Sequence, residues 1–177
     1  MRYSVAIQPQ SGYQVVALKD QTTGTIVQLY SFGALLNAFT IQTKTGTFNG
    51  IDGFENILDA VNNCTAGFKS SKLSPFVCRL QHGKYRFDQK EYTVEGFYLG
   101  DHAIHGILFN AAFQITDTKS TDTEASVIFS HHYKGTDAGY PFPFKLHVKW
   151  KLTSGNQLHV FTTATNNHNS AIPFSDG

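Results

Sequence analysis

Two histidines and one aspartate fall together in a short segment of the chain that begins and ends with glycine. Asp101, His102 and His105 lie between Gly100 and Gly106. An imidazole that titrates near neutral pH can hydrogen-bond a sugar oxygen or transfer a proton. A zinc site needs further Cys or His ligands, and this H-x-x-H spacing has no third one nearby. The segment therefore predicts a binding or acid–base loop between strands, and no bound metal is expected.

Arg79 is the other side chain that could bind a polar ligand. It lies in the largely apolar stretch Ser74–Leu80, and burying an unpaired guanidinium is costly. One interpretation is an internal salt bridge, and the other is a planar fork that donates hydrogen bonds to the hydroxyl groups of a ligand. The sequence leaves both open.

The remaining histidines have simpler explanations. His147 and His159 fall on the polar faces of alternating strands, where solvent exposure is expected. His131 and His132 are adjacent and would point to opposite faces of a strand, which favours a surface pair. His82 fits a turn position in Gln81-His82-Gly83.

Short strands must position these residues, because apolar and polar residues alternate along many runs of the chain. In Lys145–Lys151 the apolar Leu146, Val148 and Trp150 share one face, the pattern of a strand buried on one side. Thr153–Gln157 then predicts a hairpin turn. The expected strands are Met1–Ile7, Tyr13–Lys19, Thr25–Leu29, Leu35–Gln42, Tyr85–Phe87, Tyr92–Val94, Ala112–Asp117, Ser126–Tyr133, Phe144–Leu152 and Gln157–Thr163.

Only one helix is expected, a turn or two within Gly53–Val61. Many strands with glycine-rich turns and no alternation of strand and helix indicate an all-β fold, an antiparallel sandwich or barrel. The length of 177 residues suits one domain, and the aromatic content of 14% suits sheet packing.

The charge and hydropathy of the chain exclude some partners. The net charge is +1 without a basic block, so neither nucleic acid nor an anionic membrane surface is expected as a partner. No run approaches the roughly 20 apolar residues of a membrane helix, and the first residues lack the apolar core of a signal peptide. Cys64 and Cys78 are expected to be reduced, buried or half-buried thiols, and the protein is expected in the cytoplasm.

Six motifs along the chain occur in an order that points to one family. They are Ser31–Phe39 (SFGALLNAF), Asn49–Phe54 (NGIDGF), Ser74–Leu80 followed by Gly83–Phe87 (SPFVCRL and GKYRF), Ile104–Gly106 (IHG), Gly139–Pro141 (GYP) and Thr165–Phe174 (TNNHNSAIPF). Each is short, but together and in this order they resemble the aldose 1-epimerase (galactose mutarotase-like) family over the whole chain.

This resemblance implies a β-supersandwich and interconversion of the α and β anomers of a free aldohexose without a cofactor. It places Arg79 at the position of the substrate-binding arginine. It places His105 at the position of the first active-site histidine, which contacts the sugar near its reacting end and is the catalytic candidate of this chain. The partner implied is a small sugar, and a homodimer is left open.

The chain also departs from the family pattern. Cys78 stands where the family often has Asn, and Ile107 stands where a second Gly is common, which leaves the preferred sugar open. The family's general-acid histidine and catalytic glutamate are expected beyond Gly177. Residues 1–177 are therefore expected to form the N-terminal part of one sandwich domain, incomplete at the C-terminus and inactive alone.

Two alternatives remain from the sequence. One is a non-catalytic carbohydrate-binding or sugar-sensing module on the same fold. The other is a hexose-6-phosphate mutarotase, which would need several arginines around a phosphate dianion. The chain has three arginines, Arg2, Arg79 and Arg86, so this alternative is disfavoured.

Overall fold

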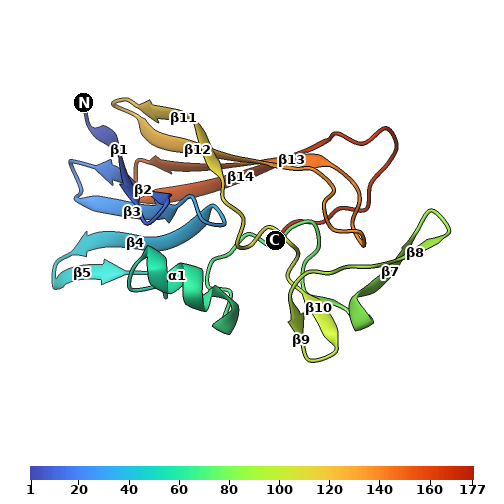
Figure 1. Ribbon diagram of the computed structural model, residues 1–177. Coiled ribbons are helices and arrows are strands. Elements are labelled where there is room, and N and C mark those ends of the chain that lie inside the picture. The colour runs from blue at the N-terminus through green and yellow to red at the C-terminus, as the bar shows by residue number, and fades with distance from the viewer.

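The computed structural model describes all 177 residues, and antiparallel sheets dominate it (Figure 1). A five-stranded sheet runs in the order β1 (Tyr3–Gln10), β2 (Tyr13–Asp20), β3 (Thr25–Tyr30), β4 (Leu35–Thr43) and β5 (Gly46–Asn49). A four-stranded sheet runs in the order β11 (Gln114–Ser120), β12 (Glu124–Tyr133), β13 (Phe144–Thr153) and β14 (Gln157–Asn166).

The segment between the two large sheets carries small elements. These are the helix α1 (Ile57–Asn63), the 3₁₀ turns at Cys64–Ala66 and Gln81–Gly83, the sheet β6 (Arg79–Leu80), β10 (His102–Ile104), β9 (Tyr98–Leu99), and the hairpin β7 (Lys84–Phe87), β8 (Lys90–Thr93). Figure 1 shows β7 and β8 as an arm away from the five-stranded sheet, and the C-terminus near the middle of the molecule.

The all-β prediction is confirmed, and each of the ten expected strands overlaps a strand of the structure. The predicted helix is present but starts later, at Ile57. Asn56 caps it, because its side-chain oxygen accepts hydrogen bonds from the N–H groups of Leu58 and Asp59. The short strands β5, β6, β9 and β10 were not predicted. His102 therefore begins a strand and does not lie in a loop.

Both large sheets contribute to one hydrophobic core. The alternation predicted along β13 is present, with Leu146, Val148 and Trp150 buried and the residues between them half-buried. Their side chains belong to the same buried cluster as Leu18 and Val27 of the first sheet. Burial of this apolar surface from two sheets is the main force that holds a sandwich together.

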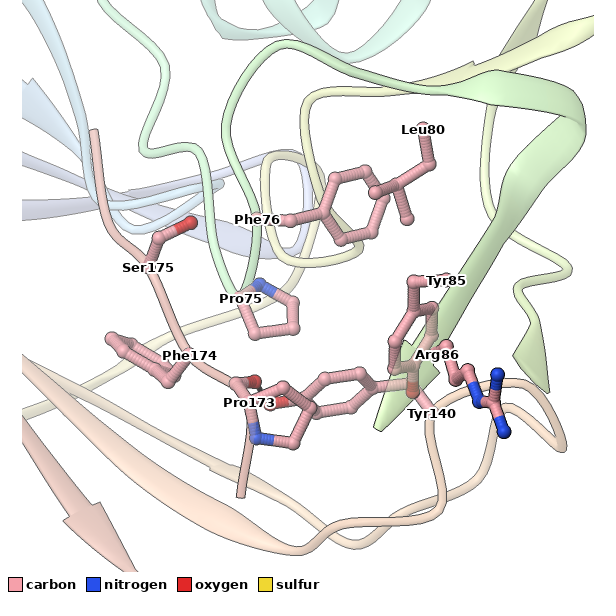
Figure 2. Close-up of a pocket in the computed structure, with 9 residues that line it drawn as sticks. All are labelled: Pro75, Phe76, Leu80, Tyr85, Arg86, Tyr140, Pro173, Phe174 and Ser175. Carbon is pink, nitrogen blue, oxygen red and sulfur yellow. Dashed lines mark hydrogen bonds between the residues drawn. The ribbon is translucent and has the colours of Figure 1, made fainter. Parts of the chain in front are cut away.

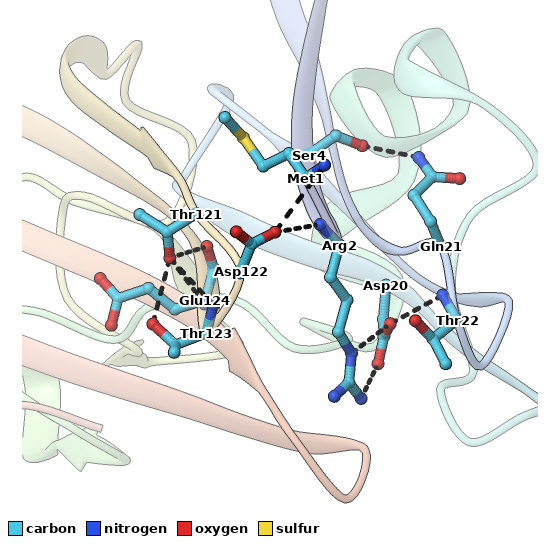
Figure 3. Close-up of polar contacts among 10 residues, drawn as sticks. All are labelled: Met1, Arg2, Ser4, Asp20, Gln21, Thr22, Thr121, Asp122, Thr123 and Glu124. Carbon is cyan, nitrogen blue, oxygen red and sulfur yellow. Dashed lines mark hydrogen bonds and ion pairs between the residues drawn. The ribbon is translucent and has the colours of Figure 1, made fainter.

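The edges of the two sheets meet at β1, where polar contacts join distant parts of the chain (Figure 3). The backbone N–H of Tyr3 donates to the carbonyl of Thr121 at 3.0 Å. Arg2 donates through its side chain to both oxygens of Asp20, at 2.9 and 2.7 Å, and Asp20 is 1% exposed. The Arg2 guanidinium and the backbone N–H of Thr22 hold the pKa of the Asp20 carboxyl well below its usual range.

At the opposite edge of the second sheet, β14 is uncovered. Its residue opposite the buried Trp150 is Val160, which points to the core side yet is 48% exposed. Phe161, on the other side of the strand, is also 48% exposed. The core is thus well packed up to β13 and open at β14.

We predict that Asp20→Asn lowers the free energy of unfolding by about 2 kcal/mol at pH 7, because charged hydrogen bonds to a buried group are lost. The folded-state pKa of Asp20 is depressed, so the ionised carboxylate gives its full stabilisation at pH values above the unfolded-state pKa of about 3.9. That stabilisation is lost as the pH falls through the folded-state pKa. Urea unfolding of both proteins from pH 7 downward measures this. A difference that grows toward low pH would contradict it.

Candidate functional site

The structure places Arg79 and His105 side by side on neighbouring chain segments. Strand β6 pairs antiparallel with β10, and Ile104 lies opposite Arg79. The next residue, His105, donates its backbone N–H to the carbonyl of Cys78 at 2.9 Å. Twenty-five residues of sequence separate the two predicted site residues, and a strand pair of two residues brings them together.

The backbone around this pair is unusual. Cys78 and His105 both have left-handed conformations, with φ of 57° and 64°. Non-glycine residues adopt this region rarely. Ten non-glycine residues in the chain have positive φ, and seven of them lie between 68 and 105: Phe68, Ser70, Cys78, His82, Asp88, Gln89 and His105. Sparsely populated backbone of this kind gathers where a structure holds functional groups in place, so the observation marks this region as the candidate site.

Gly106 explains why the loop after His105 can approach its support so closely. It has φ of +75°, and a Cβ at this position would collide with the carbonyl oxygen of Ser74. That same carbonyl accepts hydrogen bonds from the N–H groups of Ile107 and Leu108, at 2.8 and 3.2 Å. Only glycine leaves room for this arrangement, which fixes the direction in which the His105 loop leaves the strand.

The His105 ring is held in an apolar setting. Its centroid lies 4.5 Å from that of Phe68, with the planes at 65°, and Phe68 also packs against Phe97 and Phe109. The Nδ1 atom is buried without a hydrogen-bond partner. Burial lowers the pKa of His105 below 6.5, and the positive charge of Arg79 lowers this pKa further. His105 is therefore neutral near pH 7, with a ring nitrogen that can accept a proton or a hydrogen bond.

Arg79 is exposed and forms no ion pair. The interpretation as an internal salt bridge is therefore wrong. The apolar stretch around Arg79 is not buried along its whole length, since Val77, Cys78 and Arg79 all face solvent. An unpaired guanidinium next to a neutral imidazole is a donor fork beside an acceptor, which matches the hydroxyl groups of a polar ligand.

The structure does not bring His102 to the same neighbours as His105. His102 lies against His82, with ring centroids 5.2 Å apart, and its Nδ1 accepts the backbone N–H of His82 at 3.1 Å. No group of three or more His, Cys, Asp or Glu side chains is placed to hold a metal ion.

Two sequence expectations about the other histidines are corrected. His147 and His159 are half-buried and not solvent-exposed. The Nε2 atom of His147 is buried without a partner, and that of His159 lies 3.2 Å from the hydroxyl of Thr153. The alternation of apolar and polar residues predicts the face on which each ring lies and not how far neighbouring strands bury it. His131 is half-buried and His132 exposed.

The cysteines are free, and Cys64 is buried as expected. Cys78 is exposed, so the expectation of a buried or half-buried thiol is wrong there. No helix has the length and apolar character needed to cross a membrane.

A polar latch, formed by Lys72, Ser74 and Asp176, ties the last residues of the chain to the site. One Asp176 oxygen accepts from the Lys72 ammonium and the other from the Ser74 hydroxyl, each at 2.6 Å. The Lys72 and Asp176 side chains are only 11% and 22% exposed. Leu73 and Gly177 exchange two backbone hydrogen bonds, at 2.9 and 3.1 Å. Ser74 thus contacts the His105 loop through its carbonyl and the C-terminal segment through its hydroxyl.

A cavity of about 300 Å³ lies next to this latch, and Figure 2 shows the side chains around it. Its lining is mostly apolar and aromatic: Pro75, Phe76, Leu80, Tyr85, Arg86, Tyr140, Pro173, Phe174 and Ser175. Arg79 and His105 do not line it. Successive strand residues point to opposite faces, so Leu80 faces the cavity while Arg79 points away from it. We therefore place the candidate site at Arg79 and His105, where the polar groups are, and not at this cavity.

Three residues that shape the site were not among the candidate site residues drawn from the sequence. Phe68 packs on the His105 ring, and Ser74 and Asp176 hold the loop beneath it. Gly67–Phe68 resembles an ordinary loop, and Ser74 and Asp176 are 102 positions apart. Of the three, only Ser74 lay in a motif that the sequence singled out.

The architecture and the geometry of this site can now be compared with known proteins. The fold resembles that of a galactose 1-epimerase from Lactobacillus acidophilus, with a TM-score of 0.75, 17% identity, and coverage of 94% of this chain and 49% of that one. It resembles a GalM/aldose epimerase homologue from C. elegans with a TM-score of 0.71, 22% identity, and coverage of 94% and 47%. It also resembles a galactose mutarotase-like protein from Clostridium acetobutylicum, with a TM-score of 0.76, 15% identity, and coverage of 99% of this chain and 52% of that one.

These structures define the class, a galactose mutarotase-like β-sandwich, and the sequence defines the family. Residues 14–177 match the family model described as aldose 1-epimerase, so the chain belongs to the aldose 1-epimerase family. No curated protein matches the chain. The chain spans about half the length of the solved structures that it resembles.

We predict that the His105 pKa lies below 6.5 and that Arg79→Ala raises it only in part, because burial is the larger cause and remains. Titration of the histidine ring signals by NMR measures both values. Arg86→Ala is the matched control and should leave the His105 pKa unchanged. A His105 pKa above 6.5 in the unmodified protein would contradict the assignment of a neutral ring.

We predict that Asp176→Ala lowers the free energy of unfolding by about 2 kcal/mol, because Lys72 then stays largely buried without its partner. The loss is somewhat smaller than the loss from breaking a fully buried ion pair. Hydrogen exchange should accelerate at the N–H groups of Ile107 and Gly177. The control is Asp52→Ala, which removes an exposed pair with Lys69 and should cost less than about 1 kcal/mol. Unchanged exchange at Ile107 would show that the latch does not support the His105 loop.

Proposed function

We propose that this chain supplies the N-terminal part of an aldose 1-epimerase domain that interconverts the α and β anomers of a free hexose. Membership of the family supports the reaction class. The observation that carries the proposal is the position of an exposed, unpaired Arg79 beside a His105 ring held neutral by burial.

Anomer exchange needs two proton transfers. A base accepts the proton of the C1 hydroxyl while an acid protonates the ring oxygen, so the bond between C1 and the ring oxygen breaks. Rotation about the C1–C2 bond and closure by the reverse steps give the other anomer. The reaction needs positioned acid–base groups and partners for the hydroxyls, and no cofactor.

In this proposal Arg79 orients the sugar, since its fork can donate two parallel hydrogen bonds to neighbouring hydroxyl oxygens. We assign His105 as the catalytic residue of this chain, because the family resemblance places it near the reacting end of the sugar and its neutral ring can accept or pass on a proton. Phe68 lies against the ring and keeps water from part of it. The chain spans about half of its structural relatives, and we propose that residues beyond Gly177 supply the general acid and the glutamate base.

Sugar binding tests the site directly. We predict that D-galactose or D-glucose shifts the NMR signals of Arg79 and His105 in the 177-residue chain, and that Arg79→Ala weakens binding at least about tenfold, because it removes charged hydrogen bonds. Arg86→Ala is the matched control, since Arg86 lines the adjacent cavity and not the proposed site. Equal weakening by both variants would remove Arg79 from the site.

Polarimetry of freshly dissolved α-D-galactose and α-D-glucose tests the reaction. The 177-residue chain should leave the rate unchanged, and a version of the chain extended past Gly177 should accelerate the approach to equilibrium. His105→Ala in that longer protein should lower kcat by about 10²-fold or more. If sugar binds and neither protein changes the rate, the enzyme assignment fails and a non-catalytic carbohydrate-binding module takes its place.

A further inference from the structure

A polar pocket lies at one end of the four-stranded sheet, and neither Arg79 nor His105 lines it. It has a volume of about 430 Å³, within the range of small-molecule sites. Strands β11, β12 and β13 and the segments beside them supply its walls. The lining residues are Ala112, Gln114, Thr116, Ser130, His131, His132, Lys134 and Lys145, so every side chain but one is polar. None of them lines the aromatic cavity of Figure 2.

The ionisable side chains that line this pocket are all basic. Two lysines and two histidines line it, and no carboxylate does. None of the four forms an ion pair in the structure. The His131 ring is fixed, with its Nδ1 3.0 Å from the carbonyl oxygen of Ala112. Since a carbonyl oxygen can only accept, Nδ1 carries the proton in this contact.

The pairing of β12 with β13 brings two of these basic residues together. His132 lies opposite Lys145, and Ser130 lies opposite His147, on the outer face of the sheet. Lys149 and Lys151 follow Lys145 on the same face, at the alternate positions of β13. The net charge of the chain is only +1, so this outer face is more positive than the molecule as a whole.

The acidic residues on that outer face do not cancel this charge at the pocket. Glu124, at the far end of β12, is held by Lys119 at 3.0 Å. Asp117 lies opposite Ile128, which is two residues before Ser130 along β12, and does not line the pocket. Lys134 and Lys145 therefore keep ammonium groups that no carboxylate of the protein neutralises.

We propose that this pocket binds the oxyanion group of a small polyhydroxylated ligand, a phosphate ester or a carboxylate. The ammonium groups of Lys134 and Lys145 attract the negative charge, and charge-assisted hydrogen bonds to oxyanions are the strong ones. The pocket is larger than a lone oxyanion requires. Gln114, Thr116 and Ser130 add amide and hydroxyl groups that suit the hydroxyls of the remaining ligand. The proposal does not depend on the epimerase function, because the two sites share no residue.

NMR titration of the 177-residue chain with inorganic phosphate, D-glucuronate and D-glucose at low ionic strength tests the site. We expect an anion to shift the signals of Ser130, His132 and Lys145, and the affinity to fall as salt is added. Lys145→Gln should weaken anion binding about tenfold. Lys149→Gln is the matched control, because it removes the same charge from the same face of the same strand outside the pocket.

The outcomes separate the sources of the ligand and the two sites. Binding of phosphate alone assigns a phosphate ester, binding of glucuronate alone assigns a carboxylate, and binding of both assigns the oxyanion itself. Absence of both, or equal weakening by Lys145→Gln and Lys149→Gln, overturns the proposal. D-glucose binding at Arg79 should be insensitive to Lys145→Gln, so failure of the sugar site and failure of the anion pocket are told apart.

Discussion

The need to satisfy buried backbone groups outside the regular sheets determines the shape of the candidate site. Ser74 is fully buried in a stretch without helix or strand, so its polar groups must find tertiary partners. Its carbonyl accepts from the loop that follows His105, and its hydroxyl bonds Asp176 near the C-terminus. Ser74 therefore connects the loop after His105 with the C-terminal segment, and this contact supports the left-handed backbone at His105.

The electrostatics of the site follow from the same arrangement. A cation and an imidazole next to each other would repel if both were charged. Burial against Phe68 and the nearby Arg79 charge both favour the neutral ring, so Arg79 keeps its charge at the surface and His105 keeps an acceptor. The candidate site thus places a permanent hydrogen-bond donor beside a ring nitrogen that can accept a hydrogen bond.

The sequence was sufficient for the sheets and insufficient for the site's supports. Period-two patterns such as Leu146, Val148 and Trp150 predict strands because one face is buried. Strands of two or three residues, such as β6 and β10, are too short to show a period, so the adjacency of Arg79 and His105 came only from family resemblance. The partial burial of His147 is not visible in the alternation of apolar and polar residues, and the contact of Ser74 with Asp176 depends on the full tertiary path.

The uncovered edge at β14 has a practical meaning for solution work. Its ten residues contain no Asp, Glu, Lys, Arg or Pro, the residues that commonly guard sheet edges against further pairing. Val160 and Phe161 add apolar surface on both sides of that edge. At millimolar concentration, a strand from another molecule can pair with the open backbone edge of β14 and pack against its exposed apolar side chains. Dilute samples, or a charged residue placed at Thr163, are the sensible starting point for handling this polypeptide.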